Sequence, residues 1–204
     1  MKKLHRADLY NFSRFDESRN IDFHGLLWVR AGGNVAVDPV PLSAHDERHL
    51  SELGGAALVI VTNSDHVRDV LRFAEITGAR IFGPRAERSS FPVPCSEWLG
   101  DGDQPVPGLQ VLELAGSKTP GELALLIEGS RGPTLVTGDL IRAHQGGSLN
   151  LLPDAKLADR SQALASLRRL CELGDIEAVL PGDGWPVFRD GARALRELAQ
   201  AVGA

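Results

Sequence analysis

Four loops of this chain gather acidic, basic and imidazole side chains. Each loop directly follows a short apolar stretch, and the residues concerned are Asp65, His66, Lys118, Asp139 and Asp183. Carboxylate and imidazole groups are common metal ligands, and a bound metal ion can polarise a carbonyl or phosphoryl oxygen and activate water. These residue types therefore suggest a metal-binding site.

The first of these loops lies between a buried strand and a helix. Residues 56–61 form a continuous apolar run bounded by glycines and polar residues, which is typical of a strand buried on both faces. A polar cluster at residues 62–66 follows at once, and apolar residues then recur at helical spacing as far as Gly78. In layered α/β folds, loops at strand ends often carry binding and catalysis.

The remaining segments predict a succession of strands and helices. Residues 25–30 and 35–38 predict a hairpin, and Ser43 with Asp46 resembles a capping box that opens a helix ending near Gly54. Further strands are expected at residues 79–82, 109–114, 123–128, 134–137 and 178–180, and further helices at residues 159–174 and 190–202. Strands that pair first as hairpins and then alternate with helices indicate two mixed sheets with helices outside, an αββα sandwich.

Separated motifs agree in their order with those of the metallo-β-lactamase superfamily. The stretch at residues 117–122 resembles the family's GHTPG-type motif, residues 137–140 resemble its TGD motif, and residues 179–184 resemble its final PGHG loop. Asp38 resembles the early strand-end aspartate that supports the site. The resemblance extends over roughly residues 20 to 188 and implies an α/β (α+β) fold, a four-layer αββα sandwich.

The family's first metal site is missing from this sequence. Two of its histidines correspond to Val61 and Asn63 here, and the third corresponds to Lys118. Valine has no metal-binding group, and a protonated lysine repels a cation. The resemblance therefore implies that the first metal site is lost.

The family's second metal site keeps residues able to bind a metal. Its ligands correspond to Asp65, His66, Asp139 and Asp183, the last of which replaces a histidine. Three carboxylates and one imidazole favour Mn, Fe or Mg somewhat over Zn, so we expect one divalent ion (Mn, Fe or Zn) or none. The three carboxylates balance the charge of a divalent ion and the Lys118 ammonium, which is expected to occupy the space of the first metal.

Two functions are compatible with this altered site. The first is a hydrolase-like protein with single-metal hydrolysis, in which Asp65 or Asp183 serves as ligand or general base and Lys118 stabilises the developing oxyanion. The second is a non-catalytic protein that binds a small ligand or a protein partner through a metal-free polar network. The residues that would support the site or line its pocket are Asp38, Asn63, Thr119, Arg142 and His144, with an ordinary loop position as the alternative for the last two.

Composition limits the partners. The chain has 204 residues and a formal net charge of -5, with no basic stripe of the kind that holds a phosphate backbone, so nucleic acid is not expected. The longest apolar run, at residues 56–61, is far shorter than the roughly 20 residues that cross a bilayer. We therefore expect a single cytoplasmic metallo-β-lactamase-like domain over residues 1–204 that takes a small-molecule ligand or substrate.

Overall fold

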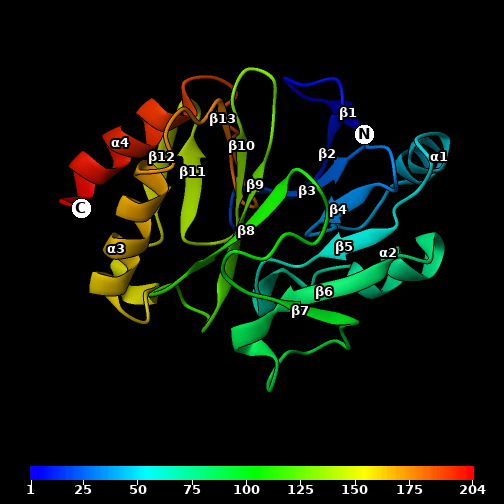
Figure 1. The fold of residues 1–204 in the computed structure, drawn as a ribbon, viewed down its shortest axis with the longest axis horizontal. Coiled ribbons are helices and arrows are strands. Elements are labelled where there is room, and N and C mark those ends of the chain that lie inside the picture. The colour runs from blue at the N-terminus through cyan, green and yellow to red at the C-terminus, as the bar shows by residue number, and fades with distance from the viewer.

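The computed structural model describes residues 1–204 and contains two main β-sheets with helices on their outer sides (Figure 1). The larger sheet has seven strands that follow one another in chain order. They are β1 (Lys2–Lys3), β2 (Leu9–Asp16), β3 (Ile21–Trp28), β4 (Val35–Val37), β5 (Leu58–Ile60), β6 (Arg80–Pro84) and β7 (Glu97–Leu99). Strands β1 to β4 pair antiparallel, and strands β4 to β7 pair parallel.

The second sheet has four strands in the order β13-β10-β9-β8. Its members are β8 (Leu109–Leu114), β9 (Glu122–Ile127), β10 (Thr134–Thr137) and β13 (Ala178–Pro181). Strands β10 and β13 are parallel, and the other neighbours are antiparallel. A separate hairpin, β11 (Ile141–Gln145) and β12 (Ser148–Leu151), follows β10.

Two pairs of helices flank the sheets on opposite sides of the molecule (Figure 1). Helices α1 (Ala44–Glu52) and α2 (Val70–Thr77) lie beside the larger sheet, and α3 (Arg160–Cys171) and α4 (Gly191–Val202) lie beside the smaller one. Short 3₁₀ turns occur at η1 (Ser64–His66), η2 (Arg85–Glu87) and η3 (Asp154–Lys156). No helix has both the length and the apolar character that a membrane span requires.

Three separate hydrophobic clusters fill the three interfaces between these four layers. Strand β5 shows why two of them form, because its residues alternate between the two faces of the sheet. Leu58 and Ile60 join the cluster between the two sheets, whereas Val59 and its neighbour Val61 join the cluster under α1 and α2. The third cluster lies between the smaller sheet and helices α3 and α4. The expected four-layer αββα sandwich, and a strand buried on both of its faces, are therefore confirmed.

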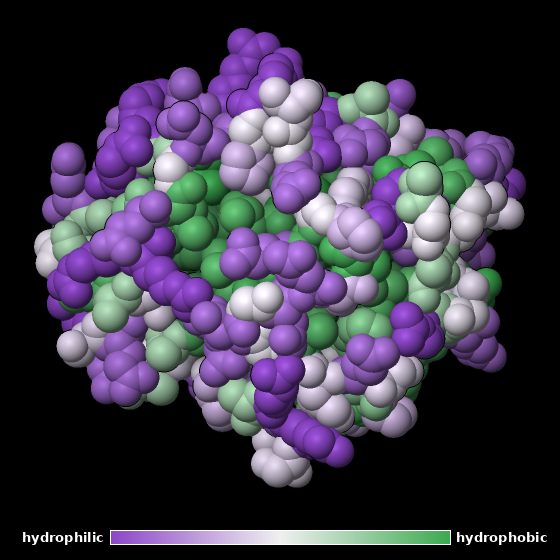
Figure 2. Space-filling model, in the orientation of Figure 1, coloured by the Kyte–Doolittle hydropathy of each residue, from purple (hydrophilic) through white to green (hydrophobic).

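The face of the molecule shown in Figure 2 carries both apolar and polar side chains. Apolar side chains reach the surface across the middle of the view, over the strands, and polar side chains surround them.

The predicted capping box is present, because the Ser43 hydroxyl accepts a hydrogen bond from the Asp46 backbone N–H and the Asp46 carboxylate accepts one from the Ser43 N–H. Helix α2 ends at Gly78, as its spacing predicted.

Five strands were not expected from the sequence, namely β1, β2, β7, β11 and β12. Strand β2 pairs with β3 over eight residues, from Leu9 opposite Trp28 to Asp16 opposite Ile21. The exposed half of β2 includes Ser13, Arg14 and Phe15, so no apolar alternation marks it as a strand. The hairpin β11–β12 is likewise held by pairing within itself and by contact with α4.

Candidate polar site at the strand ends

The candidate functional residues meet where strands of both sheets end. Asp38 follows β4, His66 lies in the turn after β5, Asp139 follows β10, and Asp183 follows β13. Strands β4 and β5 are parallel, as are β10 and β13, so each pair presents its carboxyl ends at one edge of its sheet. Packing the two sheets face to face brings these edges together.

Asp38 holds the ring of His66 from behind. Its Oδ2 lies 2.7 Å from Nδ1 of His66, and Thr62 donates to the same carboxylate from its backbone N–H at 2.7 Å and from its hydroxyl at 2.6 Å. All three side chains are buried. Asp38 adopts a left-handed backbone conformation with φ of 44°, which aspartate tolerates better than most residues. The carboxylate thus fixes the ring so that Nε2 faces the other acidic residues.

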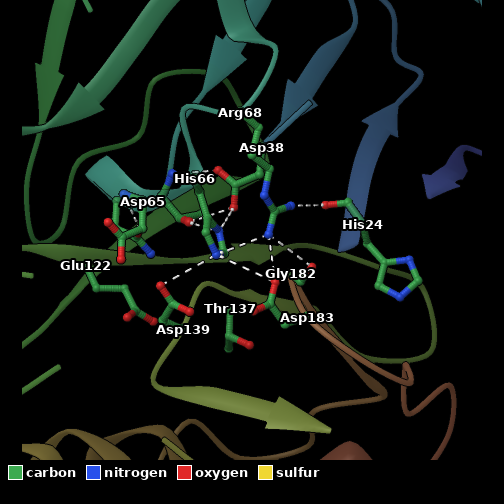
Figure 3. A network of polar contacts seen from close by, with 12 residues as sticks. His24, Asp38, Asp65, His66, Arg68, Glu122, Thr137, Asp139, Gly182 and Asp183 are labelled. Carbon is green, nitrogen blue, oxygen red and sulfur yellow. Dashed lines mark hydrogen bonds and ion pairs between the residues drawn. The ribbon is translucent and has the colours of Figure 1, made fainter. Parts of the chain in front are cut away.

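His66, Asp139 and Asp183 form a buried cluster (Figure 3). Nε2 of His66 lies 3.6 Å from Oδ2 of Asp139 and 3.8 Å from Oδ1 of Asp183. One ligand atom from each of the three residues lies within 4.8 Å of the others. The cluster therefore has the spacing and the residue types to hold one metal ion.

Lys118 lies between two carboxylates, and Asp65 pairs with it rather than joining the cluster. Nζ of Lys118 is 2.5 Å from Oδ2 of Asp65 and 2.9 Å from Oδ2 of Asp139. The side chain of Asp65 is 52% exposed, in contrast to the buried cluster. Burial opposes the charge of Lys118, but the hydrogen bonds and charges of Asp65 and Asp139 raise the pKa of the ammonium group.

Two arginines hold the carboxylate of Asp183. Nη2 of Arg68 lies 2.7 Å from Oδ1, and the guanidinium of Arg142 contacts Oδ2 and also lies 3.9 Å from Oδ1 of Asp139. Arg142 is buried on β11. The charge balance expected from the sequence counted only Lys118 beside the divalent ion. Arg68 and Arg142 add two further positive charges at Asp183, so that balance does not describe the folded site.

The cluster shifts the pKa values of its own members. Burial and the charge of Arg68 oppose protonation of His66, but Asp38 and Asp139 raise the pKa of His66 to about 9. Burial also disfavours ionisation of Asp139, but His66 and Lys118 hold the pKa of its carboxyl well below its usual range. Both shifts favour the charged forms, so ion pairs dominate the site.

The contacts of the ligand oxygens decide whether a metal ion fits this arrangement. Both oxygens of Asp183 are paired with guanidinium groups, and Oδ2 of Asp139 is paired with Lys118. Nη2 of Arg68 also lies 3.2 Å from Nε2 of His66, the nitrogen that would bind a metal. A metal ion would have to displace at least one of these cationic groups. As folded, the donor set therefore does not fit an added cation, although its three ligand atoms are close together.

The other residues proposed to support the site lie at different places. Asn63 is buried, and its Oδ1 accepts a hydrogen bond from the Asp65 backbone N–H at 2.9 Å, so it shapes the loop that carries His66. Thr119 is buried, and its hydroxyl has no hydrogen-bond partner. His144 is exposed on β11 and lies outside the cluster.

Two further residues, Arg68 and Glu122, take part in the site although they were not expected from the sequence. Arg68 lies two residues after His66, and a basic residue in the same loop as an acidic and an imidazole ligand was the available signal. Glu122 is fully buried, where it accepts hydrogen bonds from the Ser117 hydroxyl at 2.6 Å and from the Leu140 backbone N–H at 2.9 Å. It therefore ties the loop of Lys118 to the loop that follows β10.

An open cavity of about 330 Å³ leads to the cluster. Arg19 and Phe23 form part of its wall together with the charged residues already described. The guanidinium groups of Arg19 and Arg68 lie 5.6 and 5.0 Å from the centre of the Phe23 ring. The cavity is thus lined almost entirely by charged side chains, with one aromatic ring.

Solved structures of metallo-beta-lactamases share this architecture. The metallo-beta-lactamase from Pontibacter korlensis superposes with a TM-score of 0.74 at 15% identity, covering 98% of this chain and 97% of its own. The DIM-1 metallo-beta-lactamase gives a TM-score of 0.73 at 15% identity, with 96% and 94% covered. A metallo-beta-lactamase family protein from Thermus thermophilus gives 0.70 at 21% identity, with 96% and 78% covered.

At these identities the structural similarity shows the fold alone. No curated protein sequence matches the chain. The profile of one family, described as the metallo-beta-lactamase superfamily, matches residues 1–202. With nearly the whole length matched, the chain belongs to the metallo-beta-lactamase superfamily.

Proposed function

We propose that this metallo-beta-lactamase-fold protein binds a small anionic molecule in its charged cavity without a metal ion. The observation that carries the proposal is the pairing of the cluster's carboxylates with basic side chains of the same chain. Lys118 pairs with Asp139, and Arg68 and Arg142 pair with Asp183. Fixed cations therefore already supply the positive charge that a metal ion would bring.

The class of ligand follows from the one arginine of the cavity that has no carboxylate partner. Arg19 is exposed at the cavity, where it contacts the ring of Phe23 but forms no ion pair. A guanidinium group presents a planar fork of donors that matches a carboxylate or a phosphate group. A small molecule with one such group would pair with Arg19 while the rest of the molecule enters the cavity beside Lys118.

The test is binding of two simple anions, inorganic phosphate and succinate, to the purified protein. We expect either anion to raise the melting temperature, because a ligand that binds only the folded state stabilises it. Arg19→Ala should weaken binding by about tenfold or more, which is the usual effect of losing a charged hydrogen bond.

Arg80→Ala is the control, since Arg80 is also an exposed arginine over a phenylalanine ring, 5.0 Å from the centre of Phe82, although it pairs with Glu97 where Arg19 has no such partner. This control should bind as the wild type does. Absence of binding for both anions, or equal binding by Arg19→Ala, would contradict the proposed ligand class.

Single-metal hydrolysis is the second candidate. It is favoured by the spacing of His66, Asp139 and Asp183 and by the Asp38 contact that turns Nε2 of His66 toward them. Elemental mass spectrometry of protein purified without chelator, beside Asp139→Ala, separates the two candidates. About one Mn, Fe or Zn per chain, lost in the variant, would overturn the metal-free proposal and support a surviving metal site, which a screen of hydrolase substrates would then test.

A further inference from the structure

The guanidinium of Arg68 lies beside two of the three residues of the cluster, His66 and Asp183 (Figure 3). Its Nη2 is 2.7 Å from Oδ1 of Asp183 and 3.2 Å from Nε2 of His66, and these two atoms are 3.8 Å apart. A metal ion about 2.1 Å from both atoms would lie no more than about 3.2 Å from Nη2. Two cations at that distance repel each other strongly in a buried site.

The guanidinium is held in this position by several independent contacts. Nη1 of Arg68 donates to the carbonyl of His24 at 2.9 Å, and Nη2 lies 3.4 Å from the carbonyl of Gly182. The group stacks 5.0 Å from the centre of the Phe23 ring, and the side chain is only 11% exposed. These anchors come from β3 and from the loop after β13, so Arg68 cannot swing away without breaking contacts to both sheets.

The backbone at Arg68 is also unusual. Its φ is 37°, in the left-handed region that side chains other than glycine rarely adopt. The turn after η1 thus takes an unfavourable conformation at the residue whose guanidinium contacts both Asp183 and His66. The gain that offsets this cost is the set of contacts made by the guanidinium.

We propose that Arg68 is a built-in replacement for the metal ion of this site, and that removing its charge is enough to let a divalent cation bind the His66, Asp139 and Asp183 cluster. This inference rests on the proposed metal-free function. The charges support it. The site contains four carboxylates, and its basic side chains are Lys118, Arg68 and Arg142. Without Arg68, and with His66 in the neutral form that a metal ligand requires, two negative charges remain in excess, which one divalent ion would balance.

The experiment replaces Arg68 with a neutral residue and measures metal binding. Arg68→Met keeps an unbranched apolar stem, and Arg68→Gln keeps a donor for the His24 carbonyl. After dialysis against Zn²⁺ or Mn²⁺ and removal of free metal, we expect about one ion per folded chain in both variants. At saturating metal the melting temperature of each variant should rise by about 5 to 10 °C.

Three controls make the result specific to the charge of Arg68. Arg68→Lys keeps a cation in the site and should remain metal-free. Arg72→Ala removes an exposed arginine, which pairs with Glu47 on the surface, and should also remain metal-free. Arg68→Met combined with Asp139→Ala should lose the metal that the single variant gains.

The possible outcomes separate this inference from the proposed function. If the folded Arg68→Met and Arg68→Gln variants bind no metal, the inference is overturned while the metal-free function stands. If the wild-type chain itself binds one Zn²⁺ or Mn²⁺ under the same conditions, both are overturned. If Arg68→Met fails to fold, the metal content of folded Arg68→Gln alone decides whether the inference holds.

Discussion

Glu122 makes the stability of this protein depend on pH in a direction opposite to that of most acidic residues. The carboxyl is fully buried between the loop of Lys118 and the loop after β10. Burial, together with the nearby charge of Asp139, raises the pKa of Glu122 from 4.5 to about 7. The folded state therefore keeps a proton on Glu122 between these two pH values, whereas the unfolded chain releases it.

The size of the effect follows from the difference between the two pKa values. A group that binds protons more tightly in the folded state stabilises that state at low pH, and this stabilisation is lost as pH rises through the folded pKa. A difference of about 2.5 in pKa corresponds to about 3 kcal/mol. We expect the contribution of Glu122 to be complete below about pH 4.5 and absent above about pH 7.

Urea denaturation of wild type and Glu122→Gln at several values between about pH 5 and pH 8 tests this reasoning. The glutamine oxygen can accept from the Leu140 N–H, and its amide can donate to the Ser117 hydroxyl, so both hydrogen bonds have a replacement. The free energy of unfolding of the variant should rise relative to wild type by about 2 to 3 kcal/mol across this range. Glu128→Gln, at an exposed position, should show no such trend. A constant difference between Glu122→Gln and wild type at every pH would refute the argument.

Two further substitutions probe the support of His66. Gly182→Ala would place a methyl group 2.7 Å from Cε1 of His66, so we expect a loss of about 1 to 3 kcal/mol in thermal unfolding, whereas Gly146→Ala meets no atom within 4 Å and should be neutral. Equal stability of these two variants would contradict the close contact. Asp38→Ala removes the buried partner of His66 and Thr62 and should cost about 3 kcal/mol or more in urea denaturation. A loss below about 1 kcal/mol would mean that this carboxylate is not a structural support.

Much of the fold was predictable because short stretches of sequence carry its signals. The apolar run at residues 56–61 is typical of a strand buried on both sides, and the structure covers one of its faces with helices and the other with the second sheet. The capping box at Ser43 and the glycine at the end of α2 are equally local. Strand β2 escaped prediction because its order depends on pairing with β3 rather than on its own pattern.

The resemblance to the metallo-β-lactamase superfamily indicated which acidic and imidazole residues would meet, except that Asp65 pairs with Lys118 outside the buried cluster. Each of Asp38, His66, Asp139 and Asp183 follows its own strand, and parallel strands within a sheet present such residues at one edge. The arginine side chains that pair with these carboxylates could be identified only in the folded chain. Arg68 meets a carboxylate 115 positions later in the chain, and Arg142 meets the same group from 41 positions before it. No periodicity encodes such pairings, because they depend on how two sheets pack and on differences of about an ångström between cationic and anionic atoms.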